Sequence, residues 1–146
     1  MIAVDTNVLV YAHRTEMVQH GAALAALEAI WSTGRGWGLP WPCVHEFLSV
    51  VTNPRAYRTP TPMPVAIQAV GSFLTVGGRL LGESTQHLEI LASLLISGLA
   101  VGSRVHDARI AAICLGHGVT ELWTADRDFS RFPELKTRNP LVALTR

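Results

Sequence analysis

The chain has 146 residues, of which 49% are hydrophobic and 16% charged, the size and composition of one globular domain. A formal net charge of +1 excludes a protein that binds polyanions through bulk positive charge alone. No uncharged apolar run approaches about eighteen residues, and no basic segment precedes the apolar N-terminus, so we expect neither a membrane span nor a signal peptide. Two cysteines are too few for a disulfide framework, and they predict reduced thiols and a cytoplasmic location.

Short apolar segments alternate with helical patterns along the chain. Residues 2–5 predict a buried strand that ends on a carboxylate, and a helix over residues 8–12 follows. Further helices are expected at residues 19–32, 43–53, 64–76 and 104–115, and another, capped by Ser84 or Thr85, is expected to run to about residue 97. Further strands are expected at 36–40, 79–81, 121–124 and 141–144. Residues 55–64, rich in proline and arginine, predict an exposed loop. This order predicts an α/β fold with a mainly parallel sheet, formed by a single domain over residues 1–146.

Three of the four aspartates follow predicted strands. Asp5 ends the first strand, while Asp126 and Asp128 lie just past the strand that ends at Thr124. Ligands of open parallel sheets bind beyond the carboxyl ends of the strands, so we expect these three carboxylates to converge at one edge. For any one of them alone, a helix cap is the simpler interpretation.

Two further acids lie on predicted helices. Asp107 falls on an apolar side of its helix, between Ile110 and Ala111, and no Lys or Arg is expected on that face of the helix. A carboxylate that faces a core is costly unless it is paired or binds a metal. Glu46 lies at the border of the apolar face of its helix, beside Val50, where a surface glutamate is the simpler interpretation.

Taken together, these acids predict one acidic pocket made by Asp5, Glu46, Asp107 and Asp126, with Asp128 at its edge. Neighbouring carboxylates repel and raise each other's pKa, and a hard divalent cation such as Mg²⁺ or Mn²⁺ relieves that repulsion. Such an ion lowers the pKa of a bound water and neutralises charge that develops at phosphorus. The pocket therefore predicts metal-assisted hydrolysis without a protein nucleophile.

Several stretches along the chain carry a resemblance to a known family. They are Val4-Asp5-Thr6-Asn7, Glu46-Phe47, His106-Asp107-Ala108 with Ala111-Ala112, and Thr124-Ala125-Asp126-Arg127-Asp128-Phe129. In their order, their spacing and the total length, the chain resembles a PIN-domain ribonuclease, and in particular a VapC-type toxin of a bacterial type II toxin–antitoxin pair.

The resemblance implies a three-layer α/β/α sandwich with a central, mainly parallel sheet. It implies a catalytic, metal-binding quartet that holds Mg²⁺ or Mn²⁺: Asp5, Glu46, Asp107 and Asp126. Asp128 resembles the second acid of the last motif, as a further metal ligand, while Asn7 and Thr124 match positions that support the metal or its waters. The implied activity is cleavage of structured RNA such as tRNA or ribosomal RNA, by a homodimer that a cognate VapB-type antitoxin silences.

Basic residues surround the predicted pocket. Six of them lie between residues 104 and 138: Arg104, Arg109, Arg127, Arg131, Lys136 and Arg138. We expect RNA contacts from Arg109, Arg127 and Arg131, extended by Arg55 and Arg58 of the proline-rich loop. A solvated arginine-rich surface is the alternative. The apolar helices between Pro64 and Ser97 are candidates for a dimer or antitoxin face, or for the core.

Other classes of protein remain as alternatives at this point. A catalytically silent PIN-like module that binds RNA or an antitoxin is one, because a fold does not guarantee activity. A haloacid-dehalogenase-type phosphatase also begins with an aspartate after its first strand, but it needs a second acid where this chain has Asn7. A receiver domain needs a lysine beside its acidic pocket, and the only lysine, Lys136, follows no clear strand.

Overall fold

A central parallel sheet organises the computed structural model, which describes residues 1–142. Within those residues the sheet has five strands in the order β3-β2-β1-β4-β5, every neighbouring pair being parallel. The strands are β1 (Ile2–Val4), β2 (Trp37–Pro40), β3 (Gly78–Leu81), β4 (Glu121–Trp123) and β5 (Thr137–Arg138). Ala3 at the centre of β1 lies between Gly38 of β2 and Leu122 of β4.

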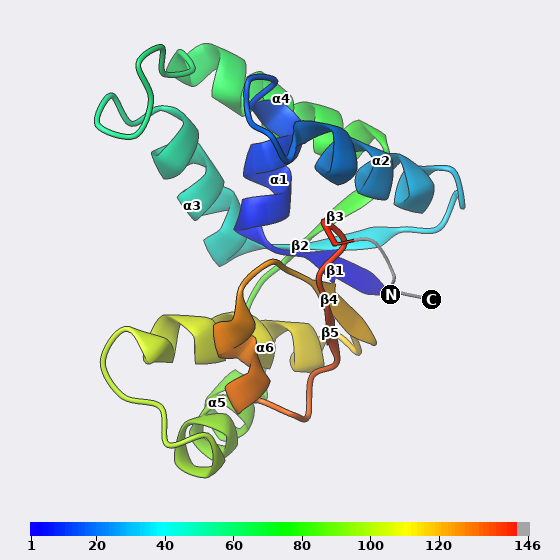
Figure 1. Ribbon diagram of the computed structural model, residues 1–146. Coiled ribbons are helices and arrows are strands. Elements are labelled where there is room, and N and C mark those ends of the chain that lie inside the picture. Colours follow the sequence, from blue (N-terminus) through cyan, green and yellow to red (C-terminus); the bar gives the residue numbers. More distant parts are fainter. Residues whose placement is uncertain (143–146) are drawn as a thin grey trace.

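Helices cover both faces of this sheet, which gives the three-layer α/β/α sandwich (Figure 1). One layer holds α1 (Thr6–His13), α2 (His20–Trp31), α3 (Trp41–Val51) and α4 (Met63–Thr75). The other holds α5 (His87–Ser97), α6 (Arg104–Gly116) and the short 3-10 helix η1 (Arg127–Arg131). The α/β fold class predicted from the sequence is confirmed.

Alternate residues of the central strands enter opposite halves of the core. Ala3 and Leu122 pack in the cluster beneath α5 and α6, whereas Val4 and Trp123 pack in the cluster beneath α1 to α4. Successive side chains of a strand point to opposite faces of the sheet, so strands covered on both sides must be apolar throughout. This explains why the central strands read as short continuous apolar runs.

Local sequence features set several element boundaries. Asp5 caps α1 by accepting a hydrogen bond from the backbone amide of Thr6 at 2.8 Å. Pro42 lies in the first turn of α3, where its missing amide hydrogen costs nothing. A side chain at Gly38 would bring its Cβ within 2.7 Å of Leu81, so β2 and its neighbours approach closely because of this glycine.

The last strand and one helix cap differ from the sequence prediction. Leu141 and Val142 form no strand, and residues 143–144 of the expected edge strand lie outside the described residues. Instead Thr137–Arg138 pairs with β4, because backbone amides along β4 and just after it find carbonyl acceptors in this segment. Leu122 N donates to Lys136 O, and Thr124 N donates to Arg138 O, both at 2.9 Å. Helix α5 begins at His87, later than predicted, after Gln86, which makes no capping side-chain bond.

The order of the strands places a crevice between β1 and β4. From β1 the chain moves outward through β2 to β3, and then returns to β4 on the other side of β1. The connections on the two sides of β1 diverge, and this topological switch point is where open α/β sheets bind ligands. Asp5 follows β1 directly, and Thr124 follows β4.

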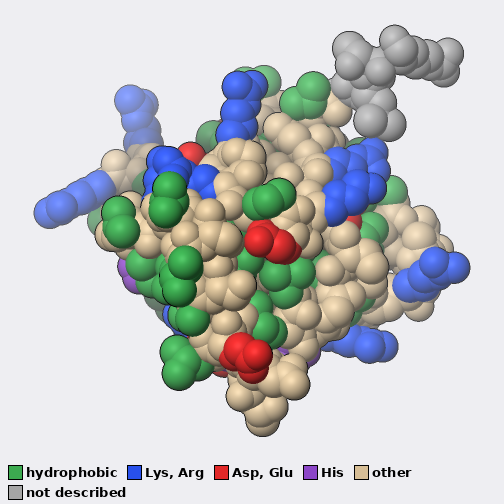
Figure 2. Space-filling view, turned by 90° about the horizontal axis from the view of Figure 1, so that it is seen from below, with side chains coloured by type: hydrophobic (Ala, Val, Ile, Leu, Met, Phe, Trp, Pro, Cys, Tyr) green, Lys and Arg blue, Asp and Glu red, His purple; other side chains and the backbone are tan. Residues whose placement is uncertain are grey.

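Both helical layers expose apolar side chains. In α4 these include Val65 and Ile67, and in α5 they include Leu88 and Ile96. Figure 2 views the α5 and α6 layer, with hydrophobic side chains spread over it and basic ones towards its margins. The sequence suggested that the helices between Pro64 and Ser97 form one dimer or antitoxin face. Because α4 and α5 lie on opposite sides of the sheet, their exposed apolar side chains form two separate faces. Among residues 1–142, no helix has the length and apolar character needed to cross a membrane.

Candidate active site

A cleft of about 290 Å³ opens at the carboxyl edge of the sheet, at the switch point. All four members of the predicted acidic quartet line it: Asp5, Glu46, Asp107 and Asp126. They come from four separate places in the fold, namely the end of β1, α3, the first turn of α6 and the loop after β4. The structure thus brings together carboxylates that are up to 121 positions apart in the numbering, between Asp5 and Asp126.

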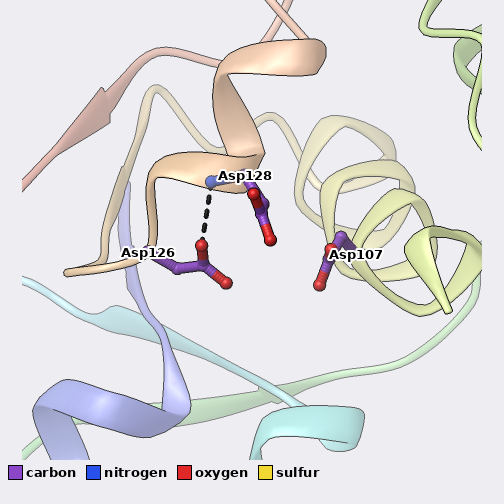
Figure 3. A group of neighbouring side chains, drawn as sticks. All are labelled: Asp107, Asp126 and Asp128. Carbon is purple, nitrogen blue, oxygen red and sulfur yellow. Dashed lines mark hydrogen bonds between the residues drawn. The ribbon is translucent and has the colours of Figure 1, made fainter.

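Three carboxylates form a tighter group within this region. Asp107, Asp126 and Asp128 each offer an oxygen, and these oxygens lie within 4.8 Å of one another. Figure 3 shows the three side chains directed towards a common space between α6 and η1, with the Asp128 amide donating to Asp126 at 2.8 Å. In the described part of the chain, Asp5 and Glu46 belong to no such group. Asp128, expected at the edge of the pocket and as a further metal ligand, does not line the cleft, and its carboxylate belongs to this tight group.

Asp5 is the buried anchor of the cleft, with 5% of its surface exposed. Its Oδ1 accepts from Thr6 N at 2.8 Å and from the Cys43 thiol at 3.4 Å. Its Oδ2 accepts from Thr124 Oγ1 at 2.6 Å and from Asn7 Nδ2 at 3.2 Å. Burial nevertheless raises the pKa of Asp5, because desolvation outweighs these hydrogen bonds.

Asn7 and Thr124 connect the ends of β1 and β4. The Asn7 Oδ1 accepts from Ala125 N at 3.0 Å, and its Nδ2 donates to Thr124 Oγ1 at 3.3 Å. The same threonine oxygen accepts from Asp126 N at 3.0 Å. These two polar side chains therefore hold the loop that carries Asp126 in place beside Asp5.

Thr6 and Cys43 are contacts of the site that sequence reasoning did not single out. The Thr6 hydroxyl lies 3.1 Å from Glu46 Oε2, to which it donates, and 3.3 Å from the carbonyl oxygen of Cys43. Cys43 lies three residues before Glu46 on α3, a spacing that puts both on one side of a helix, and this was the available signal. Burial raises the pKa of the Cys43 thiol, so it remains a protonated donor to Asp5.

Both burial and the neighbouring carboxylates act on Asp107. Burial, and then the charges of Asp126, Asp128 and Asp5, raise its pKa from 3.8 to about 6. The expectation that no basic residue serves this face of α6 is wrong. Arg104, one turn earlier, places Nη1 3.1 Å from Asp128 Oδ1 and partly offsets the rise in the Asp107 pKa.

The predicted RNA contacts differ in their surroundings. Arg109 is engaged with Glu83, its Nε donating to Oε1 at 2.8 Å, so this cation is already paired within the chain. The other candidates are exposed, two on η1 and two in the loop between α3 and α4: Arg127, Arg131, Arg55 and Arg58.

A parallel α/β/α fold with an acidic cleft at its switch point is typical of several classes of metal-dependent enzyme, nucleases among them, and comparison with known proteins distinguishes between these classes. The sequence matches the PIN domain family over residues 2–135. Ribonuclease VapC43 of Mycobacterium tuberculosis is 37% identical over 146 residues, covering 99% of each chain.

Solved structures show the same fold at lower identity. FitAcB from Neisseria gonorrhoeae has a TM-score of 0.70 and 21% identity, covering 96% of this chain and 98% of that chain. A toxin–antitoxin complex from Klebsiella pneumoniae has a TM-score of 0.65 and 20% identity, covering 96% and 98%.

The chain belongs to the PIN-domain family and, within it, to the VapC ribonucleases. This membership sets aside the haloacid-dehalogenase and receiver-domain alternatives. PIN ribonucleases generally use a divalent metal, and the all-oxygen cluster of Asp107, Asp126 and Asp128 suits a hard cation.

Proposed function

We propose that this chain acts as one nuclease domain, a Mg²⁺- or Mn²⁺-dependent endoribonuclease toxin that hydrolyses phosphodiester bonds of structured RNA such as tRNA or ribosomal RNA. The observation that carries the proposal is the convergence of Asp5, Glu46, Asp107 and Asp126 on one cleft at the switch point of the sheet. Membership of the VapC ribonucleases supports the same activity.

The acidic residues of the site have different proposed roles. Asp107, Asp126 and Asp128 would hold the cation, because their oxygens already lie within 4.8 Å of one another. Asp5 would join them by giving up one of its longer hydrogen bonds, those from Cys43 and Asn7. When bound, a divalent ion supplies Lewis-acid polarisation of phosphate and a bound water of lowered pKa.

Glu46 is proposed to take the proton from the attacking water. It lines the cleft from the α3 wall, outside the tight aspartate group, and the Thr6 hydroxyl orients its Oε2. A carboxylate that is positioned but not part of the closest cation cluster is suited to accept a proton. Asn7 and Thr124 would act as positioning residues that hold Asp5 and the Asp126 loop.

The proposed partners are a cognate VapB-type antitoxin, which silences the enzyme, and a second copy of the chain in a homodimer. Membership of the VapC ribonucleases supports the antitoxin. The exposed apolar faces of α4 and α5 offer surfaces for protein partners. The proposed compartment is the cytoplasm, which the two free, buried cysteines, Cys43 and Cys114, favour.

Cleavage assays test the proposal. The parent and three variants, Asp5→Asn, Glu46→Gln and Asp107→Asn, are incubated with total tRNA and with ribosomal RNA, in Mn²⁺ and in EDTA. We expect metal-dependent cleavage by the parent and losses of orders of magnitude in each variant, with folding retained by circular dichroism. Glu28→Gln, on the exposed side of α2, is the matched control and should cleave like the parent.

The same assay separates the enzyme from a catalytically silent binding module. A folded parent that binds RNA but cleaves none of it in either metal would support the silent module. Cleavage that survives Asp5→Asn would show that the assigned cleft is not the active site. Addition of the product of a neighbouring small reading frame should suppress cleavage if it is the antitoxin.

A further inference from the structure

The cleft has a second half whose character differs from the acidic half. Beyond the quartet it is lined mainly by apolar and aromatic side chains: Val10, Tyr11, Met17, Val50, Tyr57, Ile110 and Phe129. The chain has two tyrosines, and both line this one cleft. Neither takes part in the acidic site described above.

Helical spacing places this second half next to the acidic half. On α1, Asn7 and Tyr11 are four residues apart, and on α3 so are Glu46 and Val50. Residues four apart share a helix face and are offset by about 6 Å along the axis. Since all four line the cleft, each helix presents a polar group at the acidic centre and an apolar group one turn away.

Tyr57 is held at the cleft by a clamp from the loop after α1. The Arg14 guanidinium lies 4.0 Å from the centre of the Tyr57 ring. Arg14 also donates to the carbonyl of Thr59 at 2.9 Å and to the Thr61 hydroxyl at 3.2 Å, and its side chain is only 10% exposed. The proline-rich loop is therefore fixed against α1 where it carries Tyr57.

Tyr57 and Met17 line both this cleft and a neighbouring one of about 660 Å³ that contains Arg14 and Arg58. The aromatic half thus lies between the carboxylate cluster and a groove in which Arg14 is paired with Glu16 and Arg58 is exposed. A nucleic-acid strand needs a site for a phosphate, a flat apolar site for the adjoining base and a cation near its backbone. The carboxylate cluster with its proposed divalent ion, the aromatic half and exposed Arg58 would offer these one after another.

We infer that Tyr11 and Tyr57 form a nucleobase subsite, in which a base flanking the scissile phosphate of a single-stranded RNA segment stacks against aromatic surface. The inference rests on the proposed ribonuclease function and deepens it. An unpaired base fits better than a duplex, because only an unstacked base can enter a cleft of about 290 Å³. The subsite gives the proline-rich loop a role in target choice.

Binding of short RNA tests the subsite. Asp5→Asn protein, which should not turn over, is titrated with a single-stranded RNA decamer and with a decamer of the same length whose ribosides are all abasic. Both probes carry the same phosphates, and the salt concentration is fixed because phosphate contacts are salt-dependent. The difference between them reports the contribution of the bases alone.

Added to that background, Tyr57→Ala and Tyr11→Ala should each weaken binding of the base-bearing decamer about 10-fold, the order expected for losing one base–aromatic stack. Binding of the abasic decamer should not change. In the same Asp5→Asn background, Tyr57→Phe should leave the affinity for the base-bearing decamer unchanged, because stacking needs the ring and not the hydroxyl. Trp41→Ala is the matched control, since Trp41 is 40% exposed and lines neither cleft.

Unchanged decamer affinity in both folded alanine variants would overturn the subsite, as would equal losses for the two probes. The subsite would also be overturned if the alanine variants lost affinity for the antitoxin and kept their affinity for the decamer, since the cleft would then bind a peptide. These failures are distinct from failure of the proposed function. If the parent protein cleaves no RNA, the proposed nuclease activity is refuted, while the base-dependent effect of Tyr57 on binding can still stand. If the parent cleaves RNA but neither tyrosine substitution changes decamer binding, only the subsite is refuted.

Discussion

Replacement of Asp107 by asparagine should stabilise the metal-free protein while removing its activity. Asp107 has its pKa raised from 3.8 to about 6 by burial and by the charges of Asp126, Asp128 and Asp5. At 1.36 kcal/mol per pKa unit, that rise corresponds to about 3 kcal/mol against the ionised form. Because the side chain is partly exposed, solvent screening reduces the expected gain to about 1 to 1.5 kcal/mol.

The direction of the Asp107 pKa shift determines the pH range in which the variant is more stable than the parent. Below about pH 4 the carboxyl group of Asp107 is protonated in both folded and unfolded chains, so the variant gains nothing. Between about pH 4 and 6 the unfolded chain ionises first, and the parent loses stability relative to Asp107→Asn. Above about pH 6 the full difference is present.

Urea unfolding in EDTA at several values between pH 4 and 8 measures this difference, with Glu28→Gln as a control for removing an exposed carboxylate. Added Mn²⁺ at pH 7.5 should raise the unfolding free energy of the parent more than that of the variant, since only the parent keeps all three clustered carboxylates. A stability difference that is independent of pH, or a variant less stable than the parent above pH 6, would refute the reasoning.

Further predictions concern the residues around the cluster. Thr124→Val removes the 2.6 Å hydrogen bond to buried Asp5 and should lower the unfolding free energy by about 1 to 3 kcal/mol at pH 7, measured in urea. An unchanged value would mean that Asp5 does not depend on this donor. Arg14→Ala should cost about 2 kcal/mol and speed proteolysis within residues 52–62, because the clamp on that loop is lost; a loop equally resistant in the variant would contradict the clamp. Arg127→Ala with Arg131→Ala should lower the slope of log RNA affinity against log salt by about 1, with little effect on turnover at saturating RNA. An identical salt slope would show that η1 does not contact phosphate.

Much of the fold follows from local pattern. The apolar run before Asp5 and the helical spacing of residues 104–115 are properties of neighbouring residues, and they predict strand and helix from periodicity alone. The expected strand at residues 141–144 shows where such reasoning fails. A short edge strand at Thr137–Arg138, both exposed, forms because backbone groups find partners on β4, and no apolar pattern marks it.

The sequence by itself determined which acids this protein has and that they follow strands or face the core, because strand ends and helix faces are local features. Only the tertiary structure decided which acids are closest. It brought Asp128 into the cluster, left Asp5 bound by protein donors, supplied Arg104 as counter-charge and fixed Tyr57 beneath Arg14. These distances join segments far apart in the chain, and they depend on how whole layers pack, which no local pattern encodes.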